Sequence, residues 1–108
     1  MKRALFVCTQ NLQRSPTAER VFAGRPGLEV ASAGIARDAV TPVSPELIRW
    51  ADLVFVMEPW HRDALIGRFG PLLGDKRVIC LEIPDEYWFM DPALVELLQA
   101  RVEPYLRE

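Results

Sequence analysis

The chain has 108 residues, of which 50% are hydrophobic and 26% charged, a composition typical of a folded globular domain rather than a disordered chain. Its 13 basic and 15 acidic residues nearly cancel, so its net charge provides no general attraction to nucleic acid or anionic membranes. Two cysteines are too few for a disulfide framework, and no apolar run approaches the roughly 18 residues of a membrane span. We therefore expect one cytoplasmic domain over residues 1–108, without a nucleic-acid or membrane partner.

Short apolar runs predict the strands of this domain. Residues 4–8, 53–57 and 78–81 are almost entirely apolar, and turn or charged residues flank each run. Runs that are continuously apolar, rather than alternating, are typical of strands covered on both faces, as in a parallel sheet. Residues 28–32 include Glu29 and predict an edge strand.

The predicted helices begin with a shared dipeptide pattern. In Ser15-Pro16, Ser44-Pro45, Glu58-Pro59 and Asp91-Pro92, an oxygen-bearing side chain precedes a proline. This pattern suits an N-cap followed by the first helical residue. We expect the first helix to end near Gly24 and the third near Gly70. The last helix would carry a buried apolar stripe until Pro104 disturbs it; the stripe consists of Leu94, Leu97, Leu98, Val102 and Tyr105.

Strands and helices therefore alternate along the chain. With right-handed crossovers, this order predicts a three-layer α/β sandwich of flavodoxin-like or Rossmann-like type, with a four-stranded parallel sheet in the order 2-1-3-4. Ligands of such sheets bind beyond the C-terminal ends of the strands. Cys8 lies at the end of the first predicted strand.

The loop that follows Cys8 has the parts of an anion site. A loop between a strand end and a helix start can point several N–H groups inward, and the helix dipole adds positive potential. Arg14 adds a planar fork for two oxygens of phosphate or sulfate, while the positive field favours a nucleophilic thiolate at Cys8. Ser15 is placed to donate a hydrogen bond to the sulfur. The predicted phosphate-binding residues are Thr9, Gln10, Asn11, Leu12, Gln13, Arg14 and Ser15.

These residues carry a family resemblance. The run CTQNLQRSPTAE resembles the phosphate-binding loop and first helix of low-molecular-weight protein tyrosine phosphatases. The resemblance continues in order through SAG at residues 32–34, the acidic and apolar run at 52–58 and IPDEYW at 83–88. It implies that Cys8 is the nucleophile, that Arg14 binds the phosphoryl group, that Asn11 and Ser15 order the loop, and that Asp85 is the general acid.

Chemistry also requires a general acid, because a tyrosine phenolate, with a parent pKa of about 10, leaves poorly unless protonated. Asp91 precedes Pro92 and has a sufficient role as an N-cap, whereas Asp85 has no visible capping role and is the better candidate. Tyr87 and Trp88 are predicted to form a pocket wall for a flat leaving group, or alternatively to plug the edge of the core.

Two other polar residues have open interpretations. Glu58 has two possible roles, orienting Arg14 or only capping the helix at Pro59. His61 is interpreted as a surface residue of the third helix rather than a catalytic one.

Several positions depart from the family pattern. Gln10 replaces a usual glycine, Gln13 replaces a second loop cysteine, and Glu86 replaces a proline beside Asp85. The connection over residues 34–42 is short and lacks the usual aromatic wall, which predicts a shallower pocket.

The resulting hypothesis is a metal-independent phosphomonoesterase, in particular a protein tyrosine phosphatase, that forms a phosphocysteine and requires no cofactor. Its substrate would be a phosphotyrosine protein or a small aryl phosphate. One alternative is a non-catalytic domain that binds phosphate or phosphoproteins. Another is an arsenate reductase, for which Cys80, in a predicted buried strand, would be a poor relay.

Overall fold

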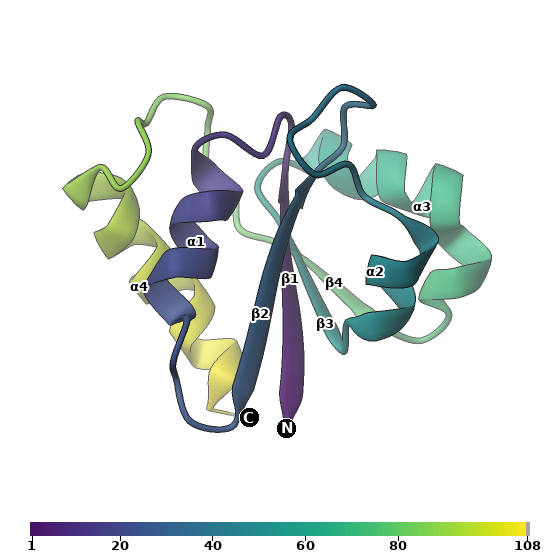
Figure 1. The fold of residues 1–108 in the computed structure, drawn as a ribbon, viewed down its shortest axis with the longest axis horizontal. Helices are drawn as coiled ribbons and strands as arrows, with labels where there is room; N and C mark the ends of the chain where they lie inside the picture. Colours follow the sequence, from purple (N-terminus) through teal and green to yellow (C-terminus); the bar gives the residue numbers. More distant parts are fainter. Residues whose placement is uncertain (108) are drawn as a thin grey trace.

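The fold is an alternation of four strands and four helices, seen in a computed structural model that describes residues 1–107 (Figure 1). In chain order the elements are β1 (Lys2–Cys8), α1 (Arg14–Phe22), β2 (Leu28–Gly34), α2 (Pro45–Trp50), β3 (Leu53–Val56), α3 (Pro59–Leu73), β4 (Arg77–Cys80) and α4 (Pro92–Leu106).

The strands form one parallel sheet in the order β2-β1-β3-β4, which confirms the predicted topology. β1 lies between β2 and β3, so Cys8 pairs with Gly34 on one side while Val7 pairs with Val56 on the other. The expected edge strand, β2, lies at an edge of the sheet. β1 and β2 are longer than their apolar runs, because their ladder extends from Lys2 opposite Leu28 to the end of both strands.

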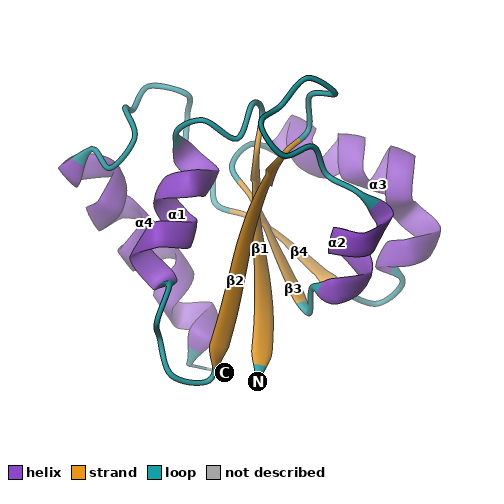
Figure 2. Ribbon diagram, in the orientation of Figure 1, coloured by secondary structure: helices purple, strands orange, loops and turns teal. Residues whose placement is uncertain are grey.

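Helices cover both faces of the sheet, as Figure 2 shows with the strands in orange between two groups of purple helices. α1 and α4 pack on one face, and α2 and α3 on the other. Alternate residues of β1 enter the two cores, with Ala4 and Phe6 facing α1 and α4 and Leu5 and Val7 facing α2 and α3. This double burial explains why the strands are continuously apolar.

Three of the four predicted helix starts are confirmed, and the first is wrong. Ser44, Glu58 and Asp91 are N-caps followed by proline, whereas α1 begins at Arg14 with Gln13 as its N-cap. Pro16 is thus the third helical residue. Its missing N–H does no harm there, because the first turn of a helix has no internal acceptor for that group.

The predicted helix ends are partly wrong. α1 ends at Phe22, close to the left-handed Gly24. α3 continues past Gly70 to Leu73, with a kink at Phe69, and α4 continues through Pro104 to Leu106. Packing outweighs the local effect of Pro104, since Leu94, Leu98 and Val102 of the predicted stripe are fully buried. None of the helices within residues 1–107 combines the length and apolar character that a membrane span requires.

Candidate active site

The loop of residues 9–13 joins β1 to α1 at the C-terminal edge of the sheet. The carbonyls of Cys8, Thr9 and Gln10, at the start of this loop, accept hydrogen bonds from the connection over residues 34–42. The donors are the N–H groups of Ile35, Ala36 and Val40, in that order, at 2.9–3.1 Å. The short 34–42 connection therefore packs behind the loop and fixes its backbone. Its side chains contribute to the core here, with Ile35 and Ala39 both buried.

The sharp bend of the loop lies at Asn11, whose φ of 60° is left-handed. Asparagine tolerates this conformation better than most residues. Its side-chain amide donates to Ser15 Oγ at 2.9 Å and to Ser32 Oγ at 3.0 Å, which ties the bend to α1 and β2. Gln10, in contrast, has no left-handed backbone that would demand a glycine.

Cys8 is 3% exposed, and its Sγ lies 3.0 Å from Ser15 Oγ. The Ser15 hydroxyl also accepts from Asn11 and lies 3.1 Å from Ala33 O, to which it can donate. It has one hydrogen for two acceptors, Ala33 O and the sulfur. A thiolate at Cys8 would draw that hydrogen from Ala33 O to the sulfur. Ser15 can therefore donate a hydrogen bond that stabilises the thiolate.

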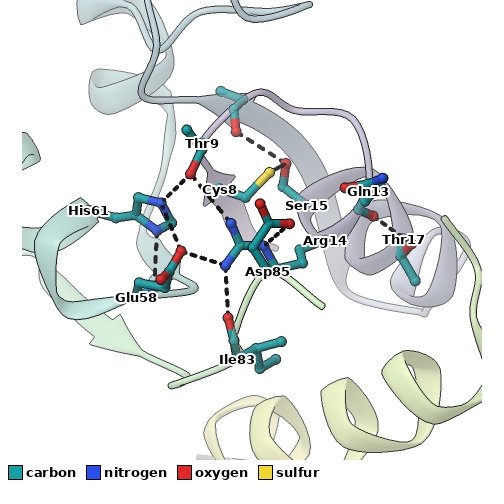
Figure 3. A network of polar contacts seen from close by, with 11 residues as sticks. Cys8, Thr9, Gln13, Arg14, Ser15, Thr17, Glu58, His61, Ile83 and Asp85 are labelled. Atoms are coloured by element: carbon teal, nitrogen blue, oxygen red, sulfur yellow. Dashed lines mark hydrogen bonds and ion pairs between the residues drawn. The ribbon is translucent and has the colours of Figure 1, made fainter. Parts of the chain in front are cut away.

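Arg14 carries a buried, paired positive charge (Figure 3). Its Nη1 donates to Glu58 Oε2 and to Ile83 O, both at 2.8 Å, and its Nε lies 3.8 Å from Asp85 Oδ1. Glu58 is also the N-cap residue of α3, so it contacts Arg14 and begins the helix at the same time. A charge that is 2% exposed needs such partners to offset its desolvation.

His61 does not lie on the surface as predicted. Its side chain is fully buried behind the loop, with Nε2 2.9 Å from Thr9 Oγ1 and Nδ1 accepting from the Glu58 N–H at 3.0 Å. Burial, together with the nearby Arg14 charge, lowers the pKa of His61 from 6.5 to about 4. The ring is therefore neutral at pH 7 and, since Nδ1 accepts, Nε2–H donates to Thr9. The sequence held a signal for this position of His61, because His61 lies three residues after the N-cap Glu58, which is the spacing of a capping box.

Asp85 reaches the loop from the segment after β4. It lines a pocket of about 100 Å³, suited to a small tetrahedral anion, together with Cys8, Thr9, Gln10, Leu12, Gln13 and Arg14. Its side chain is 62% exposed, so its carboxyl group is open to solvent as well as to the pocket. Asp91 accepts from the Ala93 N–H at 2.9 Å and is a helix cap, as expected.

The two aromatic residues next to Asp85 differ in environment. Tyr87 packs partly against the core between the sheet and α4, whereas Trp88 is 76% exposed. Both line a groove of about 300 Å³ that shares Gln13 and Asp85 with the anion pocket. Tyr87 thus lies both in the groove and against the core, whereas Trp88 only lines the groove, and a wall for the leaving group stays a prediction.

Comparisons with known proteins point to one family, although no family model matches the chain. A protein-arginine-phosphatase of Geobacillus stearothermophilus is 33% identical over 98 residues, an alignment that covers 68% of this chain and 66% of that protein. The chain thus spans just under two thirds of this relative. The solved structure of the YwlE arginine phosphatase from the same organism has a TM-score of 0.78 at 26% identity, covering 99% of this chain and 94% of that one.

Two further solved structures contain a phosphoryl or phosphonate group. A cysteine-to-serine mutant of the YwlE arginine phosphatase, with a phosphorylated active-site serine, has a TM-score of 0.74 at 27% identity and covers 98% of this chain and 96% of that one. Vibrio vulnificus Wzb in complex with benzylphosphonate has a TM-score of 0.79 at 26% identity, covering 98% of this chain and 97% of that one. With the shared fold and the ordered motifs, these relatives show that the chain belongs to the low-molecular-weight protein tyrosine phosphatase family.

Proposed function

We propose that this protein is a metal-independent phosphatase that hydrolyses phosphorylated protein side chains or small aryl phosphates through a phosphocysteine. The observation that supports this most is that the Cys8 thiol, the Arg14 guanidinium and the Asp85 carboxyl group line one small pocket. The relatives named as phosphatases, one with a phosphorylated active-site side chain, favour catalysis over simple phosphate binding.

The proposed reaction has two steps. In the first, Cys8 Sγ attacks phosphorus, the bond to the leaving group breaks, and Asp85 gives its proton to the departing atom. In the second, Asp85 takes a proton from water, which attacks phosphorus and releases phosphate and the Cys8 thiolate. Arg14 stabilises the transferring phosphoryl oxygens in both steps, because its fork can bind two of them.

Two substrate classes fit this proposal. Phosphotyrosine follows from the family resemblance, and the aromatic groove beside Asp85 offers a wall for a phenol ring. Phosphoarginine is the second candidate. It is favoured by the arginine phosphatase relative and by Glu86, which lines the same groove beside Asp85 and would attract the guanidinium that leaves after protonation.

An arsenate reductase that passes a disulfide between Cys8 and Cys80 is disfavoured by geometry. Cys8 belongs to the core between the sheet and α1 and α4, whereas Cys80 packs with the core on the opposite face. Both cysteines are free thiols in the structure, consistent with the reducing cytoplasm that we propose as the location.

The test is hydrolysis of aryl phosphate, phosphotyrosine peptide and phosphoarginine peptide in the presence of EDTA. We expect turnover by the wild type, loss of at least about a thousandfold in Cys8→Ser, and near-normal turnover in the matched control Cys80→Ser. The ratio of kcat/KM for the two peptides assigns the substrate class. Unchanged turnover in Cys8→Ser would eliminate the phosphocysteine mechanism.

A further inference from the structure

The segment that carries Asp85, residues 82–91, has no regular secondary structure but has an unusual backbone. Glu82 at its start and Met90 near its end have φ values of 54° and 61°, in the left-handed region. Side chains other than glycine and asparagine rarely adopt this conformation, and surrounding contacts must hold them in it. Such contacts are present at both ends.

The first end is fixed by two arginines. Arg101 of α4 donates from Nη1 to Leu81 O at 2.5 Å and to Glu82 O at 2.8 Å, and Arg14 donates to Ile83 O at 2.8 Å. Asp85 follows Ile83 by two residues. The carbonyls that precede the proposed acid are therefore bound to side chains from α4 and α1.

The other end is fixed by one buried hydroxyl. Thr17, in the first turns of α1, is fully buried, and its Oγ1 accepts from the Met90 N–H at 2.9 Å. The same Oγ1 donates to Gln13 O at 2.6 Å (Figure 3). Gln13 is the N-cap of α1 and lines both the anion pocket and the aromatic groove. One side chain thus joins the phosphate-binding loop to the segment that carries Asp85.

We propose that Thr17 is a positioning residue for the general acid. By holding Met90 in register with Gln13, it fixes the distance between the Asp85 carboxyl group and a phosphoryl group in the loop. This inference rests on the proposed phosphatase function and adds to it a residue that does not touch the substrate. Without the hydroxyl, proton transfer to the leaving group weakens, while binding of the anion and attack by Cys8 continue.

The test compares leaving groups in Thr17→Val, which keeps the side-chain shape and removes the hydroxyl. With phenyl phosphate, whose leaving group has a pKa near 10 and needs the proton, we expect kcat/KM, which reports the steps up to formation of the phosphocysteine, to fall about tenfold or more. With an aryl phosphate whose phenol is much more acidic, we expect a fall of about twofold, and inhibition by inorganic phosphate should stay unchanged in both cases. Thr17→Ser, which keeps the hydroxyl, should restore the phenyl phosphate rate.

A matched control is Ser44→Ala, which removes the hydroxyl that caps α2, on the opposite face of the sheet. It should leave the dependence on the leaving group unchanged. In an Asp85→Asn background, Thr17→Val should cause no further loss of kcat/KM for phenyl phosphate, because the acid that Thr17 positions is gone. Equal losses of kcat/KM for both leaving groups, or a further loss of kcat/KM in that background, would overturn the role of Thr17.

Amide exchange separates this outcome from failure of the proposed function. In Thr17→Val the Met90 amide should exchange faster, since it loses its acceptor, whereas in Ser44→Ala it should not. An inactive wild type would end the proposed function and with it any role in proton transfer. Active wild type with unchanged Met90 exchange in Thr17→Val would overturn the positioning role alone.

Discussion

A buried, neutral imidazole supports the phosphate-binding loop from behind. His61 uses both ring nitrogens, one as the acceptor for the Glu58 N–H and one as the donor to Thr9 Oγ1. Thr9 Oγ1 in turn lies 3.4 Å from Arg14 Nη2. Protonation at Nδ1 would remove the acceptor for the Glu58 N–H and add a second positive charge near Arg14.

His61 should therefore make the protein sensitive to acid. The pKa of His61 falls from 6.5 in the unfolded chain to about 4 in the folded protein, so the unfolded chain binds more protons as pH decreases. The free energy of unfolding should then decline as pH falls from about 6.5 through 4, by about 3 kcal/mol from this group. Urea unfolding at pH 7, 5.5 and 4 measures this decline.

The comparison variant is His61→Gln, which does not titrate in this range. It should be less stable than wild type at pH 7, because a buried hydrogen-bonded group is replaced, but its stability should change less between pH 7 and 4. Identical pH slopes for the two proteins would contradict the prediction.

At the level of elements, the end of β2 is shaped to accept the phosphate-binding loop. A Cβ added to Gly34 would lie 2.6 Å from Ala39 Cβ, 2.7 Å from Thr9 O and 3.0 Å from Asn11 N. Two of these neighbours are backbone atoms of the loop, which cannot move without reshaping the anion site. Glycine is needed here for close approach of chains rather than for its backbone freedom.

Gly34→Ala should therefore weaken both stability and anion binding. We expect a loss of about 1–3 kcal/mol in the free energy of unfolding, from overpacking, and weaker inhibition by inorganic phosphate. Gly67→Ala in α3 is a matched control, because nothing lies within 4 Å of the added Cβ. Its higher helix propensity should raise stability by about 0.5–1 kcal/mol. Equal phosphate inhibition in Gly34→Ala and wild type would count against the tight contact.

For the molecule as a whole, the proposed site is assembled from β1, α1, α3 and the segment after β4, so a ligand bound there should stabilise the entire fold. Inorganic phosphate at about 100 times its Kd should raise the free energy of unfolding by about 2.7 kcal/mol and the unfolding temperature by about 10 °C. Thermal scans with phosphate, against sodium chloride at equal ionic strength, measure the shift. Arg14→Lys should lose most of it, since an ammonium lacks the planar fork; an undiminished shift would mean that phosphate binds elsewhere.

The sequence predicted the architecture well because its signals are local. Continuous apolar runs located three strands, the run of residues 28–32 that includes Glu29 located the edge strand, and Ser44, Glu58 and Asp91 before prolines located three helix starts. The failures came from contacts between distant residues. Ser15 looked like a helix cap, but its hydroxyl lies between Cys8, Asn11 and Ala33, the last 18 positions away.

The residues of the candidate site were predicted only where a local motif marks them. Cys8, Arg14 and Asp85 stand in motifs and do line one pocket. The burial of His61 depends on Thr9, 52 positions earlier, and the link between Thr17 and Met90 spans 73 positions. The spacing of Glu58 and His61 is a local signal for the capping box, but nothing local links His61 to Thr9 or Thr17 to Met90, so only the folded chain shows these contacts.

The pairing of Arg14 has a consequence for the order of folding. Its acceptors at Glu58 and Ile83 lie 44 and 69 positions further along the chain. During synthesis from the N-terminus, Arg14 is made well before either acceptor, so it must stay hydrated until most of the chain has been made. The second edge of β1 likewise stays unpaired until β3 has been synthesised. Assembly of the anion site is therefore a late step, and an incomplete chain that ends before residue 83 would hold Cys8 without a completed pocket.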